Sequence, residues 1–367
     1  ESRIFNVTYN RLLPGDANLT LTYLNSREEE ALYRMVDTGY PLIGDQPTVP
    51  TETAPDGRPI YNQTGKNGYH AGLYNQCCGN REVLSATFSK AFRDGDTLLS
   101  LSYTAQDAEQ LSGMTSSTSN SNYGKVGAVD YNNRQVGRSI YEVQHRFLAT
   151  LSSKHYFFGD NATTFNLFYG RESGQSMYPV FDTYTSNPSQ YRQRAWGHDF
   201  QVNDDNLGLL YIPTYNDPLV CWSSGCENEG TAEAALREQE VLTHLYTVWG
   251  LEGYAGQISP RDAGSFPWQT TLDFSLVQEL PGIREGDQFI VTFAIDNLLN
   301  LIDEDKGIVR YGYYSGRVPV IDLKIIDNTR FDYSRNAFRH NFSDPFNIDR
   351  STTQSLWRAS LGFQYKF

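Results

Sequence analysis

The sequence lacks any apolar run of about 18 or more residues, the length a membrane-spanning helix needs, so a helical membrane protein is excluded. Its first residues, Glu-Ser-Arg-Ile-Phe, lack the positive end, apolar centre and cleavage site of a signal peptide, so we expect any export signal to lie outside this sequence. Basic residues are also few: 30 Lys and Arg stand against 43 Asp and Glu, which leaves a net charge of −13. This balance argues against nucleic acid as a partner, because a phosphate-binding face has to be basic.

Motifs of common catalytic sites are missing as well. There is no Gly-x-Ser-x-Gly elbow, no His-Glu-x-x-His helix and no Gly-x4-Gly-Lys-Ser/Thr loop. The six histidines are scattered, at positions 70, 145, 155, 198, 244 and 340. Acidic pairs such as Asp204 and Asp205 imitate part of a hydrolase site, but 43 carboxylates make chance neighbours expected. We therefore expect a protein that is not an enzyme.

Cysteine is scarce, with four in 367 residues, and occurs as two close pairs in surroundings rich in Gly, Asn and Ser. The pairs are Cys77 with Cys78 and Cys221 with Cys226. This pattern is typical of disulfides in an oxidising compartment, although the sequence leaves the pairing open. A four-cysteine zinc site is one alternative, but the spacing is not the usual Cys-x2-Cys repeated twice. Reduced cysteines without a role are the other.

Aromatic residues are abundant by contrast, at 14%, while charged residues make up only 20%. Large aromatics in a polar chain suit β-structure with one face toward an apolar environment and the other toward water. Nine segments alternate apolar and polar residues, each about the 9 to 11 residues of a tilted membrane strand. In the first eight, the apolar positions are Phe5, Val7, Tyr9; Leu19, Leu21, Tyr23; Leu84, Ala86, Phe88; Leu99, Leu101, Tyr103; Phe147, Ala149, Leu151; Phe165, Leu167, Tyr169; Leu272, Phe274, Leu276; and Phe289, Val291, Phe293, Ile295.

The last segment shows the clearest alternation. Its apolar parity holds Trp357, Ala359, Leu361, Phe363, Tyr365 and the terminal Phe367. The other parity holds Arg358, Ser360, Gly362, Gln364 and Lys366. A half-buried strand of a soluble sandwich gives the same pattern in any one segment. Nine such segments, most with aromatics near one end, favour a transmembrane barrel, and a final strand of this kind is what the barrel-assembly machinery would insert.

The connections between these segments alternate between short and long. The short ones are Gly/Asp/Pro/Asn turns at 13–16, 93–96, 158–161 and 281–287, and the long ones span roughly 25–81, 106–140, 172–267 and 298–354. Outer-membrane barrels have short periplasmic turns and long extracellular loops. The sequence therefore predicts an all-β, antiparallel transmembrane barrel of about nine strands, with a descending first strand and a periplasmic C-terminus. Because single-chain bacterial barrels usually have even strand numbers, we expect residue 1 to lie in mid-barrel.

Two features of the long connections suggest local structure. Asp199, Asn203, Asp204, Asp205 and Asn206 concentrate oxygen ligands beside Gly208, which makes this stretch a candidate calcium site, although Asx-rich turns often bind nothing. The cluster 303–305 is a weaker candidate. Residues 231–246 predict a helix capped by Thr231, and this helix is either a lid over a ligand or a strut that packs the connection down. Its apolar positions, which need cover, are Ala235, Leu236, Val241, Leu242 and Leu245.

Several stretches resemble the C-terminal barrel of TonB-dependent outer-membrane receptors, and most of all the Oar-like branch. They are Ser265-Phe-Pro-Trp-Gln-Thr-Thr-Leu-Asp-Phe-Ser-Leu-Val-Gln-Glu-Leu280, Phe293-Ala-Ile-Asp-Asn-Leu-Leu-Asn300, Ser355-Leu-Trp-Arg-Ala-Ser-Leu-Gly-Phe-Gln-Tyr-Lys-Phe367, Ala54-Pro-Asp-Gly-Arg-Pro-Ile-Tyr61, His145-Arg-Phe147, and the acidic 199–206 stretch with Leu209-Leu-Tyr-Ile-Pro213. Members of that family have a barrel of about 22 strands around an N-terminal plug, preceded by a box that engages TonB. The resemblance implies that residues 1–367 are the C-terminal portion of such a barrel, with the plug and opening strands not present.

These features predict part of a TonB-dependent receptor in the bacterial outer membrane, in which extracellular loops bind a peptide, protein or other large ligand for transport. Expected partners are outer-membrane lipid and lipopolysaccharide, the TonB system through the missing N-terminal region, and a surface lipoprotein or protein ligand. Loop aromatics would form the binding surface, among them Tyr184, Tyr191, Trp196, Trp222 and Trp249. The alternative is a barrel that supports adhesion or docks a partner without transport, and a passive porin comes third.

Overall fold

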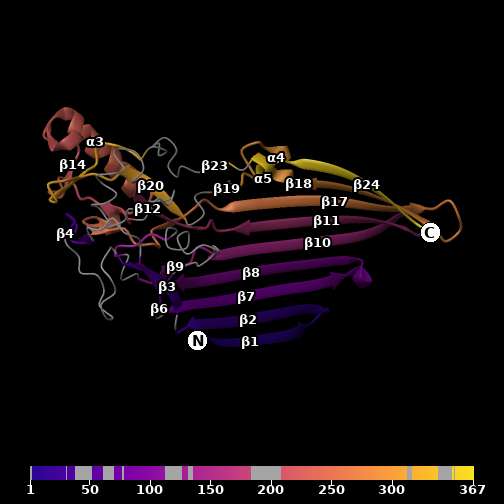
Figure 1. Cartoon of the computed structure of the whole chain (residues 1–367). Helices are drawn as coiled ribbons and strands as arrows, with labels where there is room; N and C mark the ends of the chain where they lie inside the picture. The colour runs from indigo at the N-terminus through magenta and orange to yellow at the C-terminus, as the bar shows by residue number, and fades with distance from the viewer. Residues whose placement is uncertain are drawn as a thin grey trace.

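The structure is a computed structural model that describes residues 2–29, 31–37, 52–60, 70–76, 78–111, 126–130, 135–182, 208–311, 316–337, 349–350 and 352–367. Within these residues the fold is mostly antiparallel β-sheet. The main sheet has the strand order β1-β2-β7-β8-β10-β11-β17-β18-β24, and the short strand β9 pairs with β8 (Figure 1). No helix in this described part is long and apolar enough to cross a membrane.

All nine alternating segments form the long strands of this sheet, as the sequence predicts. Their bounds are β1 Ser2–Leu13, β2 Ala17–Glu28, β7 Gly79–Phe92, β8 Thr97–Gln110, β10 His145–Phe158, β11 Asn161–Glu172, β17 Gln269–Pro281, β18 Gln288–Asp296 and β24 Arg358–Lys366. Trp357 and Phe367 flank β24 rather than belonging to it. Each long strand pairs antiparallel with its neighbours, so the sheet is a meander.

The short connections are confirmed as tight turns at one end of the sheet. Gly15 and Asp16 adopt positive φ between β1 and β2, and Arg93, Asp94 and Gly95 (η1, Arg93–Gly95) do so between β7 and β8. Gly and Asp tolerate this left-handed backbone better than most residues, which explains the composition of these turns. The odd number of long strands leaves the two chain ends at opposite ends of the sheet (Figure 1).

One face of the sheet is apolar in register across the strands. The first apolar row is Leu19, Phe88, Leu101, Ala149, Tyr169 and Leu272. The second row begins at Lys90 and continues through Leu99, Leu151, Leu167, Phe274, Ile295 and Ala359. Large side chains on this face are open to the surroundings, with 44% of Leu101 and 64% of Phe363 exposed. The sheet therefore presents an apolar face that no other described element covers.

The opposite face carries small polar side chains that bond across strands. Thr20 donates to Asn10 at 2.7 Å, and the hydroxyls of Thr87 and Ser102 lie 3.0 Å apart. Farther along, Ser152 donates to Asn166 at 2.8 Å, and Asn166 donates to Ser275 at 3.2 Å. Such cross-strand pairs stabilise the sheet and leave this face hydrophilic.

The strands are staggered along the sheet. Lys90 lies near the turn end of β7, yet its register row reaches β24 at Ala359, the second residue of that strand at the opposite end. A strand rises by about 3.3 Å per residue, and neighbouring strands lie about 4.8 Å apart. The shift therefore corresponds to strands inclined by an angle on the order of 40°. Strands in closed barrels are inclined by a similar angle.

The sheet is open in the described part of the chain. β1 pairs only with β2, and β24 pairs only with β18, so the two outer strands do not meet. The predicted barrel is therefore seen as an antiparallel, staggered sheet with two free edges, and neither closure nor a total of 22 strands is observed.

The four long connections fold together at one end of the sheet, on the left in Figure 1. Their strands are β3 Ala31–Asp37, β4 Glu52–Thr53, β5 Pro59–Ile60, β6 His70–Gln76, β9 Gly137–Arg138, β12 Ser176–Asp182, β13 Tyr211–Ile212, β14 Val220–Cys221, β15 Gln257–Ile258, β16 Gly264–Ser265, β19 Arg310–Tyr311, β20 Arg317–Asp322, β21 Ile325–Ile326, β22 Arg330–Asp332 and β23 Asp349–Arg350. The helical segments are η2 Ser224–Cys226, α3 Ala232–Thr243, the π-helical η3 His244–Val248, η4 Glu252–Tyr254, α4 Leu298–Ile302 and α5 Thr352–Ser355. We call this part the connection domain.

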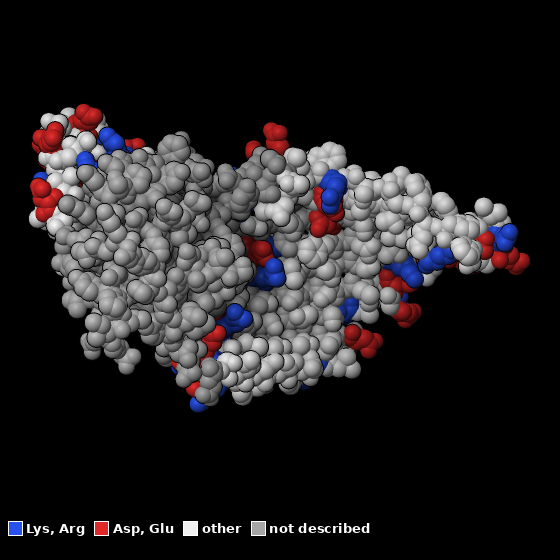
Figure 2. Space-filling view, in the orientation of Figure 1, with Lys and Arg blue, Asp and Glu red and all other residues white. Residues whose placement is uncertain are grey.

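The buried core of the described chain lies in the connection domain, and it draws on all four long connections. Its members are Ala54, Ala128, Met177, Phe181, Leu210, Tyr211, Ile212, Val220, Trp222, Ala234, Val241, Leu242, Leu245, Trp249, Leu251, Phe266, Val318, Val320, Ile321, Leu323, Phe331 and Tyr333. Two parallel strand pairs, β12 with β20 and β14 with β22, join the third connection to the fourth. Charged side chains visible in Figure 2 lie over α3 and toward the ends of the long strands.

Candidate functional site

The centre of the connection domain is a group of packed aromatic rings. The Phe181 ring lies 5.2 Å from Phe331 and 5.9 Å from Tyr333, measured between ring centroids. Trp222 packs edge-on against Tyr333 at 5.8 Å. The Tyr333 hydroxyl donates to the backbone oxygen of Tyr211 at 2.5 Å, and burial raises the pKa of Tyr333 well above its ordinary value. The phenol therefore stays protonated and keeps its bond.

The first long connection enters this core through a buried ion pair. The Arg58 guanidinium, which is almost completely buried, lies 2.5 Å from the Asp56 carboxylate. The same guanidinium stands 5.7 Å from the centre of the Phe181 ring. A buried pair of this kind is strongly destabilised when one partner is removed, because the other charge is left in a poor solvent. Among the described residues of this connection, Ala54 is the member of the core cluster, and Arg58 adds a second anchor beside it.

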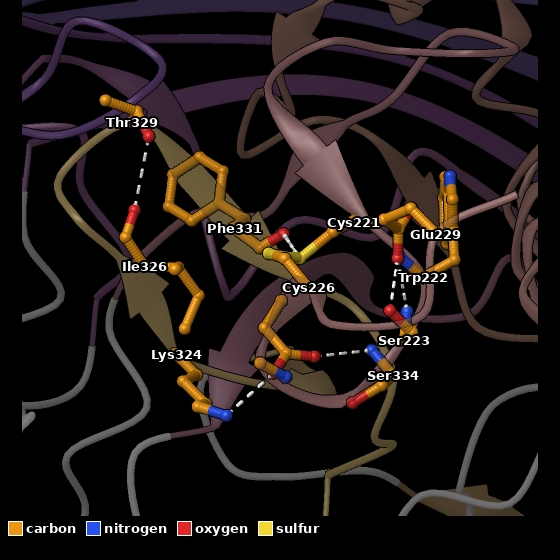
Figure 3. The surroundings of a disulfide bond; sticks show 12 residues. Cys221, Trp222, Ser223, Cys226, Glu229, Lys324, Ile326, Thr329, Phe331 and Ser334 are labelled. Atoms are coloured by element: carbon orange, nitrogen blue, oxygen red, sulfur yellow. Dashed lines mark hydrogen bonds and ion pairs between the residues drawn. A yellow bond between two sulfur atoms is a disulfide. The ribbon is translucent and has the colours of Figure 1, made fainter.

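A disulfide ties the segment after β14. Cys221 and Cys226 are bonded, and Cys221 is fully buried beside Phe331 (Figure 3). This confirms the disulfide prediction for this pair. Cys78 is also disulfide-bonded, whereas Cys77 lies outside the described residues.

Asp332 anchors the disulfide segment to the fourth connection. Its carboxylate accepts from the Gly225 N–H at 2.8 Å, from Lys324 at 2.9 Å and from the Ser334 N–H at 3.0 Å. Desolvation alone would raise the pKa of Asp332, but the hydrogen bonds from Ser334, Gly225 and Lys324 outweigh it and hold that pKa below its ordinary value. Asp332 is thus a buried structural anion.

A second carboxylate organises the other side of the same segment. One oxygen of Glu229 accepts from the N–H groups of Trp222 and Ser223 at 3.0 and 2.8 Å, and from the Ser223 hydroxyl at 2.5 Å (Figure 3). Three donors on one oxygen hold this segment in place.

The predicted helix is confirmed, including its cap. α3 starts at Ala232, and the Thr231 side chain accepts from the Ala234 N–H. Val241, Leu242 and Leu245 are buried, as expected, so the helix packs the connection down. The prediction was wrong for Ala235 and Leu236, which are exposed, whereas Ala234 is buried. Residues 234, 241 and 245 lie on one face at the helical period, and 235 and 236 lie beside it.

The continuation of α3 buries a histidine. The Trp249 indole N–H donates to His244 Nε2 at 3.1 Å, and both side chains are buried. Burial lowers the pKa of His244 to about 4, against a small opposing effect of Glu240. His244 is therefore neutral near neutral pH and acts as a structural acceptor.

The proposed aromatic binding surface needs correction. Trp222 and Trp249 are 6% and 5% exposed, so they are core residues of the connection domain and present almost no surface to a ligand. Tyr184, Tyr191 and Trp196 lie outside the described residues. Aromatic residues in polar loops are expected to bind a ligand if each loop is exposed on its own. Here the loops pack against one another, and Trp222 and Trp249 belong to their shared core.

The hollows on the described surface of the connection domain include two with charged side chains in their walls. One, of about 680 Å³, lies between α3 and the disulfide segment and is lined by Trp222, Arg237 and Arg335 among others. The other, of about 380 Å³, lies where the second and third connections meet the top of β8. At its wall Arg138 pairs with Glu142, and Arg138 also donates to the Gly264 oxygen at 3.1 Å. These hollows are where a ligand could contact the domain.

The predicted calcium ligands Asp199, Asn203, Asp204, Asp205 and Asn206 lie outside the described residues. Within the described ranges, no group of three or more His, Cys, Asp or Glu side chains is arranged to hold a metal ion. In the weaker cluster, Asp303 pairs with Lys306 at 3.1 Å. Hydrogen bonds from the Asp305 backbone and from Lys306 lower the pKa of Asp303.

An aromatic cluster marks the end of the apolar face nearest the connection domain. The Tyr103 and Phe147 rings lie 4.6 Å apart, and the His145 ring stacks on Trp268 at 6.1 Å with an interplanar angle of 1°. The Arg171 guanidinium lies 5.2 Å from the centre of the Trp268 ring. Trp268 and Arg171 both continue the apolar parity of their strands, at positions beyond the segments predicted from the alternation.

A second aromatic cluster lies at the turn end of the same face. The His155 and Phe157 rings stack at 5.3 Å, and Phe165 meets His155 edge-on at 5.8 Å. Two strands away, Phe289 lies 6.1 Å from Phe363. The apolar face is thus bordered by aromatic rings at both ends.

Within the described residues, the fold is an open antiparallel meander with one exposed apolar face, and the long connections of this meander form a folded domain at one end of it. Neither the family models nor the curated protein sequences compared with this chain give a match.

Proposed function

We propose that this chain forms part of the wall of an outer-membrane β-barrel, with its apolar face toward lipid and its connection domain on the extracellular side. The observation that carries the proposal is the apolar face itself, which is continuous in register from β2 to β24. Soluble proteins rarely expose apolar patches above a few hundred Å², because water makes them costly. Lipid removes that cost.

The height of the apolar face supports a membrane position. On β10, Phe147 and Phe157 belong to the two aromatic clusters. A rise of about 3.3 Å per residue, at an inclination of about 40°, separates these two residues by roughly 25 Å along a membrane normal. This value equals the typical height of the apolar band of transmembrane barrels, which aromatic girdles border at both interfaces.

The polar face and the free edges support a barrel wall over an isolated sheet. Thr, Ser and Asn side chains on that face would line an aqueous interior. β1 and β24 present unpaired backbone groups, which cannot be left unsatisfied in lipid. We propose that further strands, supplied with a plug by the rest of the receptor, close the barrel between these edges.

The receptor role follows from the resemblance to TonB-dependent receptors of the Oar-like branch. In this proposal the connection domain binds a peptide, a protein or another large substrate, with the hollows beside α3 and above β8 as contact regions. A plug and the TonB system then move the ligand across the outer membrane. Lipid and lipopolysaccharide surround the apolar face.

One observation favours a second candidate function. The described core of the connection domain joins residues of all four long connections, and its surface over α3 carries charged side chains (Figure 2). A firmly folded platform of this kind suits docking of a surface lipoprotein or another partner, without transport.

The same substitution on opposite faces of one strand tests the membrane position. Leu101 and Ser102 are neighbours in β8 on the apolar and polar faces. In a barrel wall, Leu101→Arg costs about 2 to 4 kcal/mol at the bilayer midplane and lowers the amount of folded protein in outer membranes. Ser102→Arg, the matched control, faces water and leaves assembly near wild type. Equal effects of both substitutions would contradict the proposal.

The receptor role has its own test. The receptor proposal predicts that the intact protein extracted from outer membranes has many more than 367 residues. Its sequence should include a plug and a TonB box. Ligand uptake should then be lost when TonB is deleted. A membrane protein that binds its partner equally well without TonB and without a plug would support the docking function.

A further inference from the structure

Arg171 is a cation on the apolar face of the sheet. It belongs to the register row Tyr9, Leu21, Ala86, Tyr103, Phe147, Arg171 and Thr270, in which it pairs with Phe147 on one side and with Thr270 on the other. Except for Thr270, the other residues of the row are apolar or aromatic. Arg171 therefore projects toward the same surroundings as the lipid-facing residues of the proposed barrel wall.

Among the described residues, the guanidinium of Arg171 is held by one aromatic ring and not by a carboxylate. It stands over the Trp268 ring at 5.2 Å and, among the described residues, makes no hydrogen bond or ion pair. The neighbouring Glu172 is turned to the other face, where it pairs with Arg146 at 2.6 Å. Within the described part of the chain, the five N–H donors of Arg171 therefore have no acceptor.

The rings around Arg171 support one another. The Tyr103 hydroxyl and His145 Nδ1 lie 2.9 Å apart, and the His145 ring stacks between Tyr103 and Trp268 at 6.1 Å from each. Phe147 lies 6.4 Å from Trp268. Trp268 and Phe147 are each 43% exposed, so this platform is open to the outside. An ordered platform lowers the entropy cost of placing the guanidinium.

The level of Arg171 along the strands is that of a membrane interface. Below it the face is apolar, with Tyr169 two residues nearer the centre of β11. Above it the same face turns acidic on β8, where Asp107 lies two residues beyond Ala105, the partner of His145. An arginine at this boundary has apolar chains on one side and headgroups on the other.

We propose that Arg171, stacked on Trp268, binds the phosphate of a membrane lipid whose acyl chains lie along the apolar rows beneath it. This inference rests on the proposed membrane position of the sheet. Phosphate suits the site because a guanidinium pairs with it through two parallel hydrogen bonds. The apolar strip formed by Phe147, Ala149 and Tyr169 gives the acyl chains a surface that a free phosphate would not use.

The test measures lipid retention by the intact protein purified from outer membranes in mild detergent. The probes are a lipid A bearing both phosphates, the same lipid A after enzymatic dephosphorylation, and inorganic phosphate. Arg171→Gln removes the charge, Arg171→Lys keeps it, and Arg81→Gln is a matched control at the same end of the sheet on the polar face. Native mass spectrometry counts bound lipid.

We expect wild type and Arg81→Gln to retain the phosphorylated lipid about tenfold more tightly than Arg171→Gln does, with Arg171→Lys in between. The dephosphorylated lipid should show no such difference, and millimolar inorganic phosphate should not displace the bound lipid. Retention that is independent of residue 171, or inorganic phosphate that binds as well as the lipid, would overturn the inference.

The failure of this inference can be told apart from failure of the proposed membrane position. All variants are first assayed for insertion into vesicles of neutral phosphatidylcholine. If the wild type inserts and residue 171 has no effect on lipid A retention, only the lipid site is wrong. If the wild type does not insert at all, the membrane position is wrong and the lipid site falls with it.

Discussion

The hydroxyl of Tyr333 donates to the backbone carbonyl oxygen of Tyr211 across 122 residues of sequence, with 2.5 Å between the two oxygens. Tyr211 follows the isolated bridge between Val180 and Leu209 in the third long connection, and Tyr333 follows β22 in the fourth. This bond therefore joins two connections at the centre of the connection domain. The domain is built from segments that precede β17 and segments that follow β18.

Replacing Tyr333 by Phe should destabilise the connection domain. The substitution removes a buried donor and leaves the Tyr211 oxygen without it, which costs about 1 to 3 kcal/mol. Denaturant unfolding followed by tryptophan fluorescence measures the effect. Tyr215→Phe is the control, since Tyr215 is 60% exposed, and it should change the stability by less than about 0.5 kcal/mol. Equal stability of Tyr333→Phe and wild type would show that the bond contributes nothing.

His244 should make the connection domain sensitive to acid. Its pKa is about 4 in the folded protein and 6.5 for the free group, so the unfolded chain binds a proton at a higher pH than the folded one. Stability is therefore full above pH 6.5 and falls as the pH drops toward 4, by about 2 kcal/mol from this group. The measurement is the unfolding free energy at pH 7 and at pH 4.5.

His244→Gln supplies the comparison for that experiment, because Gln keeps an acceptor for Trp249 but does not titrate. Asp332 contributes little to the change in unfolding free energy over this pH range, because a group with a lowered pKa changes the stability mainly below about pH 4. The unfolding free energy of wild type should fall relative to that of His244→Gln as the pH drops, so that any advantage of wild type shrinks or reverses. A difference that stays constant from pH 7 to 4.5 would argue against a neutral, buried His244.

The Cys221–Cys226 disulfide should contribute a modest amount of stability because it closes a short loop of sequence separation 5. The chain-entropy relation gives about 2 kcal/mol for such a loop. The double variant Cys221→Ala and Cys226→Ser should unfold at correspondingly lower denaturant than wild type when both proteins are kept unreduced, so that the disulfide of Cys78 stays intact in each. Alkylation of Cys221 or Cys226 in unfolded, unreduced protein, read by mass spectrometry, would show that the bond is absent.

The long strands could be predicted from sequence because each has two different environments, and an apolar residue at every second position records that difference directly. The turns could be predicted because residues such as Asp16 and Gly15 tolerate positive φ. The helix at 232–243 could be predicted from its Thr cap and composition. All these features depend on neighbours close in sequence.

The connection domain could not be predicted in the same way. Trp222 and Trp249 lie in polar stretches and look like ligand contacts, yet they are buried, because the partner that covers Trp222, Tyr333, comes from another connection. The pairing of Arg58 with the Phe181 ring likewise joins residues that no local pattern relates. The position of Arg171 on the apolar face could not be predicted for a different reason. A charged residue at the end of an alternating segment is typical of the start of a loop, and only the pairing of Arg171 with Phe147 places it on the sheet.

A nitroxide scan of β10 tests the membrane position of the sheet most directly. Spin labels are placed singly at residues 148 to 152 of the protein in lipid bilayers, and their accessibility to oxygen and to a water-soluble nickel complex is measured. We predict high oxygen accessibility at Ala149 and Leu151 and high nickel accessibility at Thr150 and Ser152, with a period of two residues. Uniform accessibility without this alternation, or nickel access at every position, would contradict the account.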